Sequence, residues 1–597
     1  MAWPHSCRIL GRRLGSAACD HVSASTRDFG GIWKLSSPSA AAYSHATRSS
    51  NVPIDNHSSS NSSNSSGTST RKFYHVGPET INSGHCWYYG LSQTSIAGAF
   101  WHNAPSQQAL HHDLSKNRHL HSSSIESKSS ASAARAAEAT TAMEHVETMH
   151  GAKAPRAESG VELTDDGEIL YSDMTSQELL VTLSNLQLLS YEPLVELSLK
   201  VLKSRLLRWP VTSTPLLWLI KRTTYSHFCA GENTVEAGQT LSRMWELGLR
   251  GVLDYSLEDA EDEQFCDDNC AGFLKTVASS RELPPGSVSF ICVKISAICP
   301  IGLLERVSDH LRWQLKNPEY KLPWKQEGLP VLAPESPTYQ TQTAPEPLSA
   351  EEEATFLRAQ QRLRLICEGC EKENIPILLD AEYTNIQPGI DYMTYVAVFE
   401  FNTGGRPIVY VTMQAYMKDT PSRLSMAMAE ASRRNAFLAL KLVRGAYIVR
   451  ESALANSLGF PSPIHNSPQE THNCYNECAS RMLHRVTSGN SSIVLATHNT
   501  SSGRILSQRA YELGLEKADP RVHFAQLKGM ADSLSLALVH AGFNVSKYVP
   551  FGPVIHVVPY LVRRAHENRG VLCNTSMDRQ RMRKELGRRL RSAVRMA

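Results

Sequence analysis

The stretch IVYVTMQAYMKDTPSRLSMAMAEASRRNAFLALKLVRGAY, residues 408–447, contains two short apolar runs separated by a longer amphipathic segment. The runs are rich in Val, Leu and other apolar residues, which is typical of parallel strands buried on both faces. The segment between them has the periodicity of a helix that covers one face of such a sheet. Residues 408–447 therefore predict one strand–helix–strand unit.

The same alternation is repeated across the C-terminal half of the chain. Strand-like runs occur at 251–255, 288–297, 375–381, 408–414, 439–446, 492–497, 522–526 and 545–549. Because eight such units can close on themselves, they favour a barrel over an open sheet. We therefore predict an α/β fold, a (β/α)8 barrel of the TIM type, over 246–575. A Pro-rich insertion at 321–347 is predicted to lie on its surface, since Pro interrupts both helices and strand ladders.

The N-terminal part of the chain has a different composition. Residues 1–40 begin with a segment that is basic, rich in Ser and Ala, and free of acidic residues up to position 19. This composition predicts an organelle transit peptide, although a basic disordered tail would have the same features. Residues 41–165 are of low complexity and are predicted to be disordered, because they cannot bury enough apolar surface to fold. Leu residues at helical spacing then predict a helical region over 166–245.

The C-terminal tail, 576–597, is basic and carries Met582, Leu586 and Leu590 at helical spacing. It is predicted to form a helix, either solvated or lying on an anionic membrane surface. No apolar run reaches the 18 residues that a spanning helix needs, so no transmembrane segment is expected. No lipidation motif is found either.

Composition also bounds the classes of function. The formal net charge of +3 is small for 597 residues and gives no reason to expect nucleic-acid binding. Cys367 and Cys370 form a C-x-x-C motif, but no second pair lies at zinc-ligand spacing, so we expect structural cysteines and no metal site. No Gly-rich dinucleotide fingerprint or Walker loop follows a strand, so a nucleotide cofactor would have to be held by the barrel itself.

Candidate catalytic residues lie at the ends of the second and third runs, where barrel enzymes gather their chemistry. Lys294 lies in an apolar strand, and burying a cation is costly unless it has a partner. It is a candidate for neutralising a carboxylate or for forming a Schiff base. Asp380 is a candidate for orienting a cationic or hydroxyl group, with capping of the next helix as the alternative.

Candidate cofactor-binding residues lie at the ends of the next three runs. Gln414 could bind a flat heterocycle through its side-chain amide. The alternative is a structural role in which this amide is hydrogen-bonded to the protein backbone. Lys441 and Arg444 call for anionic partners, such as cofactor phosphates. Gly445 would allow the backbone to approach a ligand closely. The sixth run ends in three consecutive polar residues, Thr497, His498 and Asn499.

A pair of arginines follows the eighth run. Arg563 and Arg564 lie in a predicted helix with one buried apolar face, and together they could grip one carboxylate. Glu567 is placed to pair with either arginine at helical spacing. A solvated ion pair with Glu567 is the alternative interpretation of the same residues.

Five blocks of this sequence together resemble the proline dehydrogenase family. They are LDAEYTNIQPGID at 379–391, KLVRGAY at 441–447, ATHN at 496–499, FAQLKGMAD at 524–532 and KYVPFGPVIHVVPYLVRRAHENRGVL at 547–572. The block HFCAGE at 227–232 and the long N-terminal extension are similar to plant-type members. Many bacterial members have Arg where Lys441 stands and Lys where Arg444 stands, so contact with a flavin could differ in geometry here.

The resemblance implies a distorted (β/α)8 barrel that binds FAD and oxidises L-proline to 1-pyrroline-5-carboxylate. Asp380, Tyr548, Lys294 and Lys441 would be catalytic, with Tyr548 hydrogen-bonded to Asp380. The substrate would contact Arg563, Arg564, Lys294, Tyr548, Leu527 and Glu567. FAD would contact Ala381, Gln414, Lys441, Val443, Gly445, Ala446, Tyr447, Thr497, His498 and Asn499. Either Glu258 or Glu261 would be an acidic gate residue on the first strand–helix loop.

The resemblance also implies a location and an electron acceptor. Members of this kind are mitochondrial, peripheral to the matrix face of the inner membrane, and pass electrons to a quinone. Competing hypotheses are an oxidoreductase for hydroxyproline or methylenetetrahydrofolate, a Schiff-base aldolase that uses Lys294, and an inactive homologue that serves as an interaction protein.

Overall fold

The structure is a computed structural model that describes residues 160–193, 195–196, 200, 210–570 and 572–596. The expected transit peptide at 1–40 lies outside these residues, and so does most of the region at 41–165 that was expected to be disordered. Its last residues, 160–165, are described, and the expectation is wrong for them, since Leu163 is buried in the main hydrophobic core.

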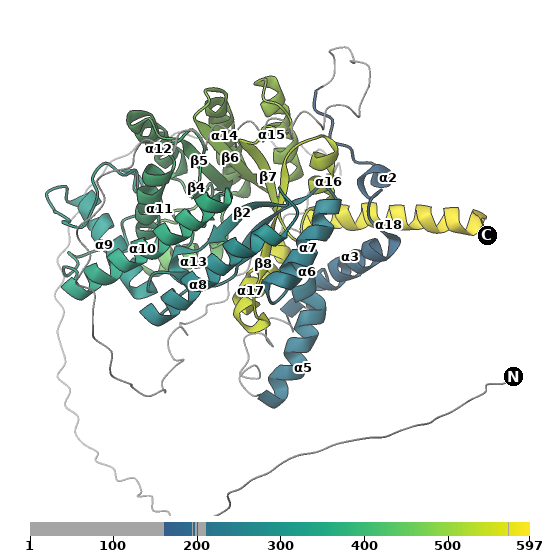
Figure 1. The fold of residues 1–597 in the computed structure, drawn as a ribbon, viewed down its shortest axis with the longest axis horizontal. Helices are drawn as coiled ribbons and strands as arrows, with labels where there is room; N and C mark the ends of the chain where they lie inside the picture. The colour runs from purple at the N-terminus through teal and green to yellow at the C-terminus, as the bar shows by residue number, and fades with distance from the viewer. Residues whose placement is uncertain (1–159, 194, 197–199, 201–209, 571, 597) are drawn as a thin grey trace, which may run out of the picture. The chain divides into compact units, whose positions relative to one another are not determined.

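Eight parallel strands form a closed barrel in which each strand pairs with its neighbours in the sequence and β1 pairs with β8 (Figure 1). The strands are β1 (Arg250–Tyr255), β2 (Val288–Val293), β3 (Ile377–Leu379), β4 (Val409–Gln414), β5 (Leu438–Val443), β6 (Ser491–Ala496), β7 (Val522–Leu527) and β8 (Val545–Phe551). Each overlaps one of the eight expected runs. The predicted (β/α)8 barrel is therefore confirmed.

Two strands end at least three residues earlier than predicted. The run expected to reach residue 297 leaves the sheet after Val293, and Lys294 precedes a short 3-10 helix, η4 (Ile295–Ala297). The fifth run, expected to reach residue 446, ends at Val443, and Gly445 adopts a φ of 134°. Apolar composition did not reveal these ends, because apolar residues such as Ile295 and Ala446 continue the pattern beyond them.

Helices follow the strands. They are α8 (Glu263–Ser279), α9 (Ile301–Lys316), α10 (Ala350–Glu373), α11 (Gln387–Phe401), α12 (Thr420–Arg434), α13 (Ile448–Ser457), α14 (Pro468–Thr487), α15 (Thr500–Glu512), α16 (Asp532–His540) and α17 (Val554–Gly570), with the 3-10 helix η3 (Ser280–Glu282) after α8. Cys367 and Cys370 are both buried thiols on α10, consistent with the structural role expected of them.

The barrel is distorted at its last unit. The helix that packs against β1 and β8 is α7 (Thr234–Glu246), which precedes the first strand. In contrast, α17 follows β8 but packs on α5 (Pro210–Ile220) and on the π-helix η2 (Lys221–Tyr225) (Figure 1). This arrangement releases α17 from the outer ring of helices, so the two arginines that it carries can contribute to the site.

The region at 166–245, which was expected to be helical, contains helices where it is described. It contains α2 (Gly167–Leu170), α3 (Ser176–Leu189), α5, η2, α6 (Ser226–Phe228) and α7. The hydroxyl of Thr175 accepts a hydrogen bond from the backbone N–H of Glu178, and Glu178 accepts one from the N–H of Thr175 in return. This capping box satisfies two N–H groups at the start of α3.

The Pro-rich insertion is not simply a surface excursion. Val331 and Ala333 are buried, and Val331 belongs to the main hydrophobic core. Ser336 donates a hydrogen bond to Asp419 Oδ2 at 2.6 Å, which ties the insertion to the start of α12. Pro prevents regular structure here, but the apolar residues between the prolines still gain free energy by burial.

The basic C-terminal tail lies within a docked helix, α18 (Leu572–Met596), which packs on α3 and α2. Met582 is fully buried, and Arg589 Nη1 donates to the carbonyl of Met174 at 2.7 Å. Leu590 and Val594 remain exposed. The expectation of a solvated or membrane-bound tail is thus wrong for this helix as far as Arg589. Within the described part of the chain, no helix is both long enough and apolar enough to cross a membrane.

Candidate active site

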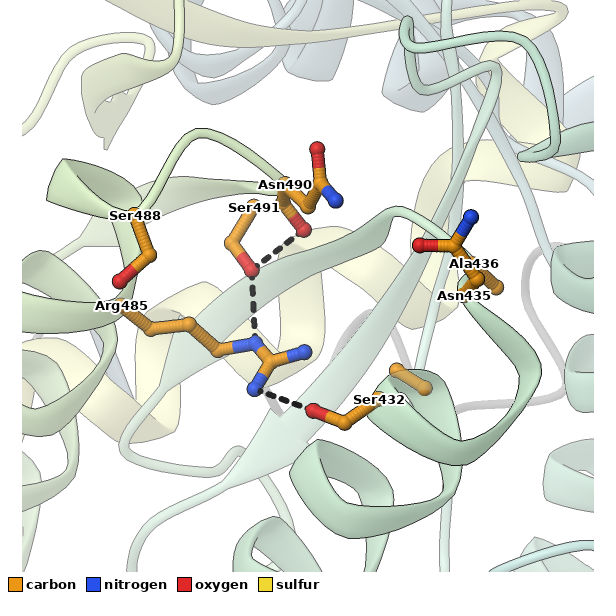
Figure 2. Close-up of a pocket in the computed structure, with 8 residues that line it drawn as sticks. Ser432, Asn435, Ala436, Arg485, Ser488, Asn490 and Ser491 are labelled. Carbon is orange, nitrogen blue, oxygen red and sulfur yellow. Dashed lines mark hydrogen bonds between the residues drawn. The ribbon is translucent and has the colours of Figure 1, made fainter.

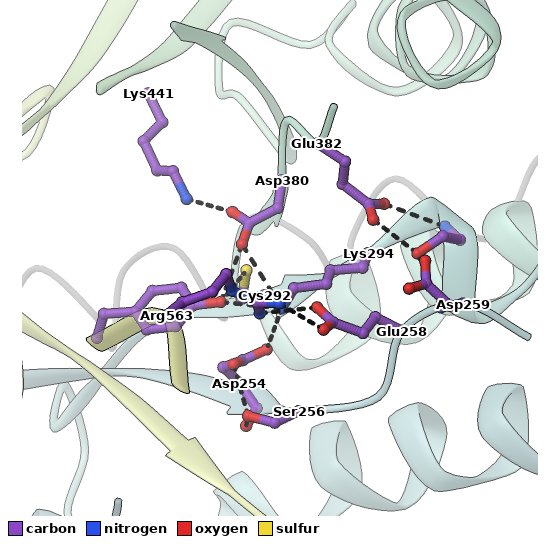
Figure 3. A network of polar contacts seen from close by, with 12 residues as sticks. Asp254, Ser256, Glu258, Asp259, Cys292, Lys294, Asp380, Glu382, Lys441 and Arg563 are labelled. Atoms are coloured by element: carbon purple, nitrogen blue, oxygen red, sulfur yellow. Dashed lines mark hydrogen bonds and ion pairs between the residues drawn. The ribbon is translucent and has the colours of Figure 1, made fainter. Parts of the chain in front are cut away.

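Charged side chains from several strands meet at the carboxyl end of the barrel (Figure 3). Lys294, just after β2, lies at the centre. Its Nζ is 3.4 Å from Asp254 Oδ1 on β1, 3.4 Å from the hydroxyl of Tyr548 on β8, and 3.9 Å from Asp380 Oδ2 after β3. Lys441 of β5 completes the group by donating to Asp380 Oδ1.

Asp380 orients its neighbours and does not cap a helix. Tyr548 donates to Asp380 Oδ2 at 2.9 Å, which is the hydrogen bond that the family resemblance implied. The next helix, α11, begins only at Gln387. Burial opposes ionisation of Asp380, but the charges of Lys441 and Lys294 outweigh it and hold its pKa at about 2. Asp380 is therefore a carboxylate at neutral pH.

Lys294 is held as a cation. Burial favours its neutral form, but Asp254 and Asp380 outweigh burial and raise the pKa of Lys294 well above its usual value. An amine must lose its proton before it can attack a carbonyl. This environment therefore disfavours the Schiff-base aldolase alternative.

Arg563 forms an ion pair with Glu258 across the mouth of the barrel. Arg563 Nη1 donates to Glu258 Oε1 at 2.6 Å, and Nη2 donates to Oε2 at 2.9 Å. Of the two acids considered for the first strand–helix loop, Glu258 is the one that enters the site. Arg563 thus has a partner that is distant in sequence, whereas the local ion pair with Glu567 stays an untested alternative. The side chain of Glu567 lies outside the described residues.

Arg564, the second arginine of α17, is 6% exposed. Its guanidinium lies over the ring of Tyr560, with Cζ 4.9 Å from the ring centroid. Leu527, at the end of β7, packs with Tyr548 against the small apolar cluster that contains Tyr560. Both predicted substrate contacts thus lie on one wall of the mouth.

Arg444 lies in the turn after β5 and donates to three uncharged partners. These are Thr497 Oγ1 at 2.5 Å, Ser502 Oγ at 2.8 Å and His472 Nδ1 at 3.0 Å. Burial lowers the pKa of Arg444. A half-buried cation among neutral partners suits an anionic ligand.

The polar residues at the end of β6 also have structural partners. His498 Nε2 accepts from the backbone N–H of Leu527 at 3.0 Å, and burial lowers the pKa of His498 to about 3. Asn499 caps α15 by accepting from the N–H of Ser502 at 2.9 Å. Gln414 is buried and donates its amide to the carbonyl of Glu382 at 2.8 Å. The backbone interaction considered for Gln414 is therefore present.

Gly445 has a different immediate neighbour from the one expected. A Cβ at this position would lie 2.5 Å from ring atoms of Tyr416, so a protein side chain already requires glycine here. Tyr447 lies beyond it and contacts Tyr383 edge-on, with ring centroids 5.7 Å apart. The remaining predicted contacts, Ala381, Val443 and Ala446, lie at the same end of β3 and β5.

Three site residues were not predicted. Asp254 is 1% exposed and accepts from Lys294 and, at 2.8 Å, from the hydroxyl of Ser256. Asp254 could have been found by the feature that identified Lys294, which is a charged residue inside an apolar strand. Cys292 donates to the Tyr548 hydroxyl at 3.4 Å, and buried Glu382 accepts from Ser296 Oγ at 2.7 Å. The sequence around Cys292 and Glu382 does not distinguish them from ordinary core or loop residues.

A polar hollow of about 350 Å³ opens at the opposite end of the barrel, where β5 and β6 begin (Figure 2). Arg485 lines it and donates to Ser491 Oγ at 2.8 Å and to Ser432 Oγ at 3.1 Å. This end of a TIM barrel serves stability and not chemistry. Among the residues that the structure describes, no group of three or more His, Cys, Asp or Glu is arranged to hold a metal ion.

Comparisons with known proteins agree with this geometry. The family model for proline dehydrogenase matches residues 237–577. Proline dehydrogenase 2, mitochondrial, from Arabidopsis thaliana is 46% identical over 73% of this chain and 92% of its own length. Proline dehydrogenase 1, mitochondrial, from the same plant is 45% identical over 74% of this chain and 90% of its own length.

A search of solved structures finds proline utilization A from Bdellovibrio bacteriovorus, inactivated by N-propargylglycine. It aligns with a TM-score of 0.49 and 18% sequence identity, and the alignment covers 77% of this chain. The chain spans 44% of the length of that larger protein.

Proposed function

Because the chain belongs to the proline dehydrogenase family and is therefore an oxidoreductase, we propose that it oxidises L-proline to 1-pyrroline-5-carboxylate with bound FAD. The observation that carries the proposal is the meeting of two features at one mouth. One is the cationic group formed by Arg563, Arg564 and Lys294, and the other is the Tyr548–Asp380 pair. The first suits the carboxylate of a small amino acid, and the second lies beside the space for its ring.

The two arginines would bind the carboxylate of proline. The ion pair with Glu258 uses one N–H from each terminal nitrogen of Arg563, and the guanidinium has further N–H groups for a second carboxylate. Arg564 is buried beside it, where little water competes for its N–H groups. Lys294, which follows β2, would add a third positive charge.

The same cations would favour the neutral form of the substrate amine. The amine must lose its proton before oxidation, and nearby positive charges raise the cost of an ammonium group. Lys294 and Lys441 both remain charged at neutral pH, because neighbouring carboxylates raise their pKa values against the effect of burial. A profile of kcat/KM against pH should therefore show an ionisation below the pKa of free proline, and its absence would contradict this role.

The turns after β5 and β6 fit FAD. Arg444 is a cation with neutral partners beside the first turn of α15, and the start of a helix also favours an anion. Arg444 and Ser502 would hold the phosphates, and Lys441, Gln414 and His498 would lie along the flavin. When bound, FAD supplies the two-electron oxidation of the carbon next to the ring nitrogen. Tyr548 and Leu527 would hold the substrate ring in the site.

We further propose a mitochondrial location with a quinone as electron acceptor, on the inner membrane's matrix face. The mitochondrial relatives at 45–46% identity support the location. The basic N-terminal segment supports it as well. The acceptor rests on the family resemblance alone.

The decisive experiment is anaerobic titration of the purified holoprotein with substrate. We expect a yellow protein whose flavin absorbance is bleached by L-proline, more readily than by 4-hydroxyproline or pyrrolidine. Bleaching by hydroxyproline in preference to proline would reassign the substrate. A flavin that is reduced by neither L-proline nor 4-hydroxyproline would contradict the proposed function.

A further inference from the structure

We propose that Tyr383 and Asp259 form a latch that holds Glu258 against Arg563 and thereby sets the affinity of the site for its substrate. Both would be positioning residues, since they act through Glu258. The effect on substrate rests on the proposed function, whereas the effect on the loop does not.

Asp259 follows Glu258 on the loop between β1 and α8, and its backbone is in an unfavourable conformation. Its φ of 56° lies in the left-handed region, which favours glycine and which Asp enters only occasionally. Such a conformation persists only where surrounding contacts enforce it, and it often occurs at functional sites. The contacts that enforce it are therefore informative.

Two hydrogen bonds hold Asp259 in place. The hydroxyl of Tyr383, on the loop after β3, donates to Asp259 Oδ1 at 2.7 Å. The backbone N–H of Asp259 donates to Ser296 Oγ at 3.2 Å. The next residue, Ala260, donates its N–H to the carbonyl of Ser296 at 2.8 Å. The loop is thus attached to the segments that follow β2 and β3. The attachment lies directly beside the Glu258–Arg563 ion pair, which we call the gate.

Glu382 fixes the other end of this attachment. Its carboxyl group accepts from Ser296 Oγ at 2.7 Å and from the Ser296 N–H at 3.2 Å. Burial raises the pKa of Glu382 to about 8. Glu382 is adjacent to Tyr383 in the sequence, so one short segment holds both Ser296 and Asp259.

The ring of Tyr383 is itself held by two other side chains. The guanidinium of Arg450 lies over its ring, with Cζ 3.6 Å from the ring centroid, and Tyr447 contacts the ring edge-on. Arg450 and Tyr447 belong to the turn and helix after β5. The latch therefore connects the gate loop to the end of β5, where the cofactor is expected.

A change of Tyr383 to Phe removes the latch hydrogen bond and keeps the ring. With the latch lost, Glu258 would no longer be held opposite Arg563. We expect the KM of Y383F for L-proline to rise roughly tenfold, the scale of one hydrogen bond to a charged group, with kcat within about twofold of wild type. D259A should match Y383F, whereas D259N keeps an acceptor oxygen and should retain most of the affinity.

Hydrogen exchange gives a readout that does not depend on turnover. In the ligand-free protein, amides of the loop at 256–262 should exchange faster in Y383F than in wild type. The matched control is Y410F, which loses a hydroxyl bonded to Ser492 Oγ at 2.7 Å inside the barrel and should leave this loop unchanged.

A double variant tests whether the latch acts through the gate. If it does, adding Y383F to E258Q should raise KM little beyond E258Q alone. Full additivity of the two changes would overturn the proposal, and so would a wild-type KM or unchanged loop exchange in Y383F. If wild type is not reduced by L-proline, the proposed function fails, and loop exchange still decides whether the latch exists.

Discussion

The hydroxyl of Tyr548 donates to Asp380 Oδ2 at 2.9 Å and so joins β8 to the end of β3, two strands that are not neighbours in the barrel. Asp380 is ionised, with a pKa of about 2, so this hydrogen bond has a charged acceptor. Such bonds contribute more than neutral ones, and the side chain of Asp380 is only 14% exposed, so water has little access to it. The pair therefore gives a rigid edge for the substrate ring.

We expect Y548F to lower kcat/KM for L-proline by about 10- to 100-fold, which corresponds to one charged hydrogen bond. The measurement is steady-state oxidation of L-proline with an artificial electron acceptor. Y410F, which loses a buried hydroxyl deeper in the same barrel, should retain activity close to wild type. Equal losses in both variants would mean that the hydroxyl of Tyr548 serves the fold alone.

The arginines of α17 should govern the choice between an amino acid and an amine. Loss of one arginine from a desolvated carboxylate site costs about 2–5 kcal/mol of binding. R564M should therefore lower kcat/KM for L-proline by about 30-fold or more, while pyrrolidine, which has no carboxylate, should change by less than about threefold.

R481M is the matched control for this change. Arg481 lies on α14 and donates to Ser425 Oγ on α12, at an exposed position outside the mouth. Its loss should leave the ratio of the two substrates unchanged. A parallel loss for proline and pyrrolidine in R564M would argue against a carboxylate clamp.

The positions of the strands could be predicted from the sequence, but the partners of the site residues could not. Parallel strands buried on both faces leave a local signal, a nearly continuous apolar run, and the eight runs follow from it. Arg563 and Glu258 are 305 positions apart. Local spacing suggested Glu567, because a helix reveals its neighbours at three and four residues and says nothing of a loop at the other end of the chain.

The place of α17 was hidden for a similar reason. Its sequence predicts a helix after β8, and the regular barrel pattern would put that helix against β1 and β8. The position is taken by α7, which precedes the first strand. Which of the two helices packs against the barrel depends on which of them buries more surface there. The periodicity of each helix alone does not reveal this.

A buried ion pair behind the site should be important for stability. Arg423 of α12 donates to Asp391 of α11, and both side chains are buried. Gln387 also donates to Asp391, at 3.0 Å. We expect R423M to lower the free energy of unfolding by about 3–5 kcal/mol, because it leaves a buried carboxylate without its cation.

The double variant D391N/R423M removes both charges and should recover part of that loss. Urea unfolding followed by circular dichroism measures both changes. If the double variant is less stable than R423M, the carboxylate of Asp391 stabilises the fold without the arginine, contrary to this expectation.

Buried histidines should make the fold less stable in mild acid. Burial lowers the pKa of His498 to about 3 and those of His227 and His523 to about 4, all below the value near 6.5 of an unfolded histidine. Between these values the unfolded chain binds protons that the folded chain does not. The stability that comes from these three residues is therefore present above pH 6.5 and is lost as the pH falls toward 4.

At pH 5.5, one unit below the unfolded pKa, each of the three should lower the free energy of unfolding by about 1 kcal/mol relative to pH 7.5. His523 is the residue to test, because it lies inside the barrel, where its Nε2 is 3.0 Å from the carbonyl of Pro520 and its ring contacts Phe290 edge-on. H523Q keeps a hydrogen-bond donor but has no ionisable group, so its urea midpoint should fall less than that of wild type between the two pH values. An equal fall of the urea midpoint in both proteins would show that His523 is already protonated in the folded state at pH 5.5. Its buried position would then have to accommodate a cation.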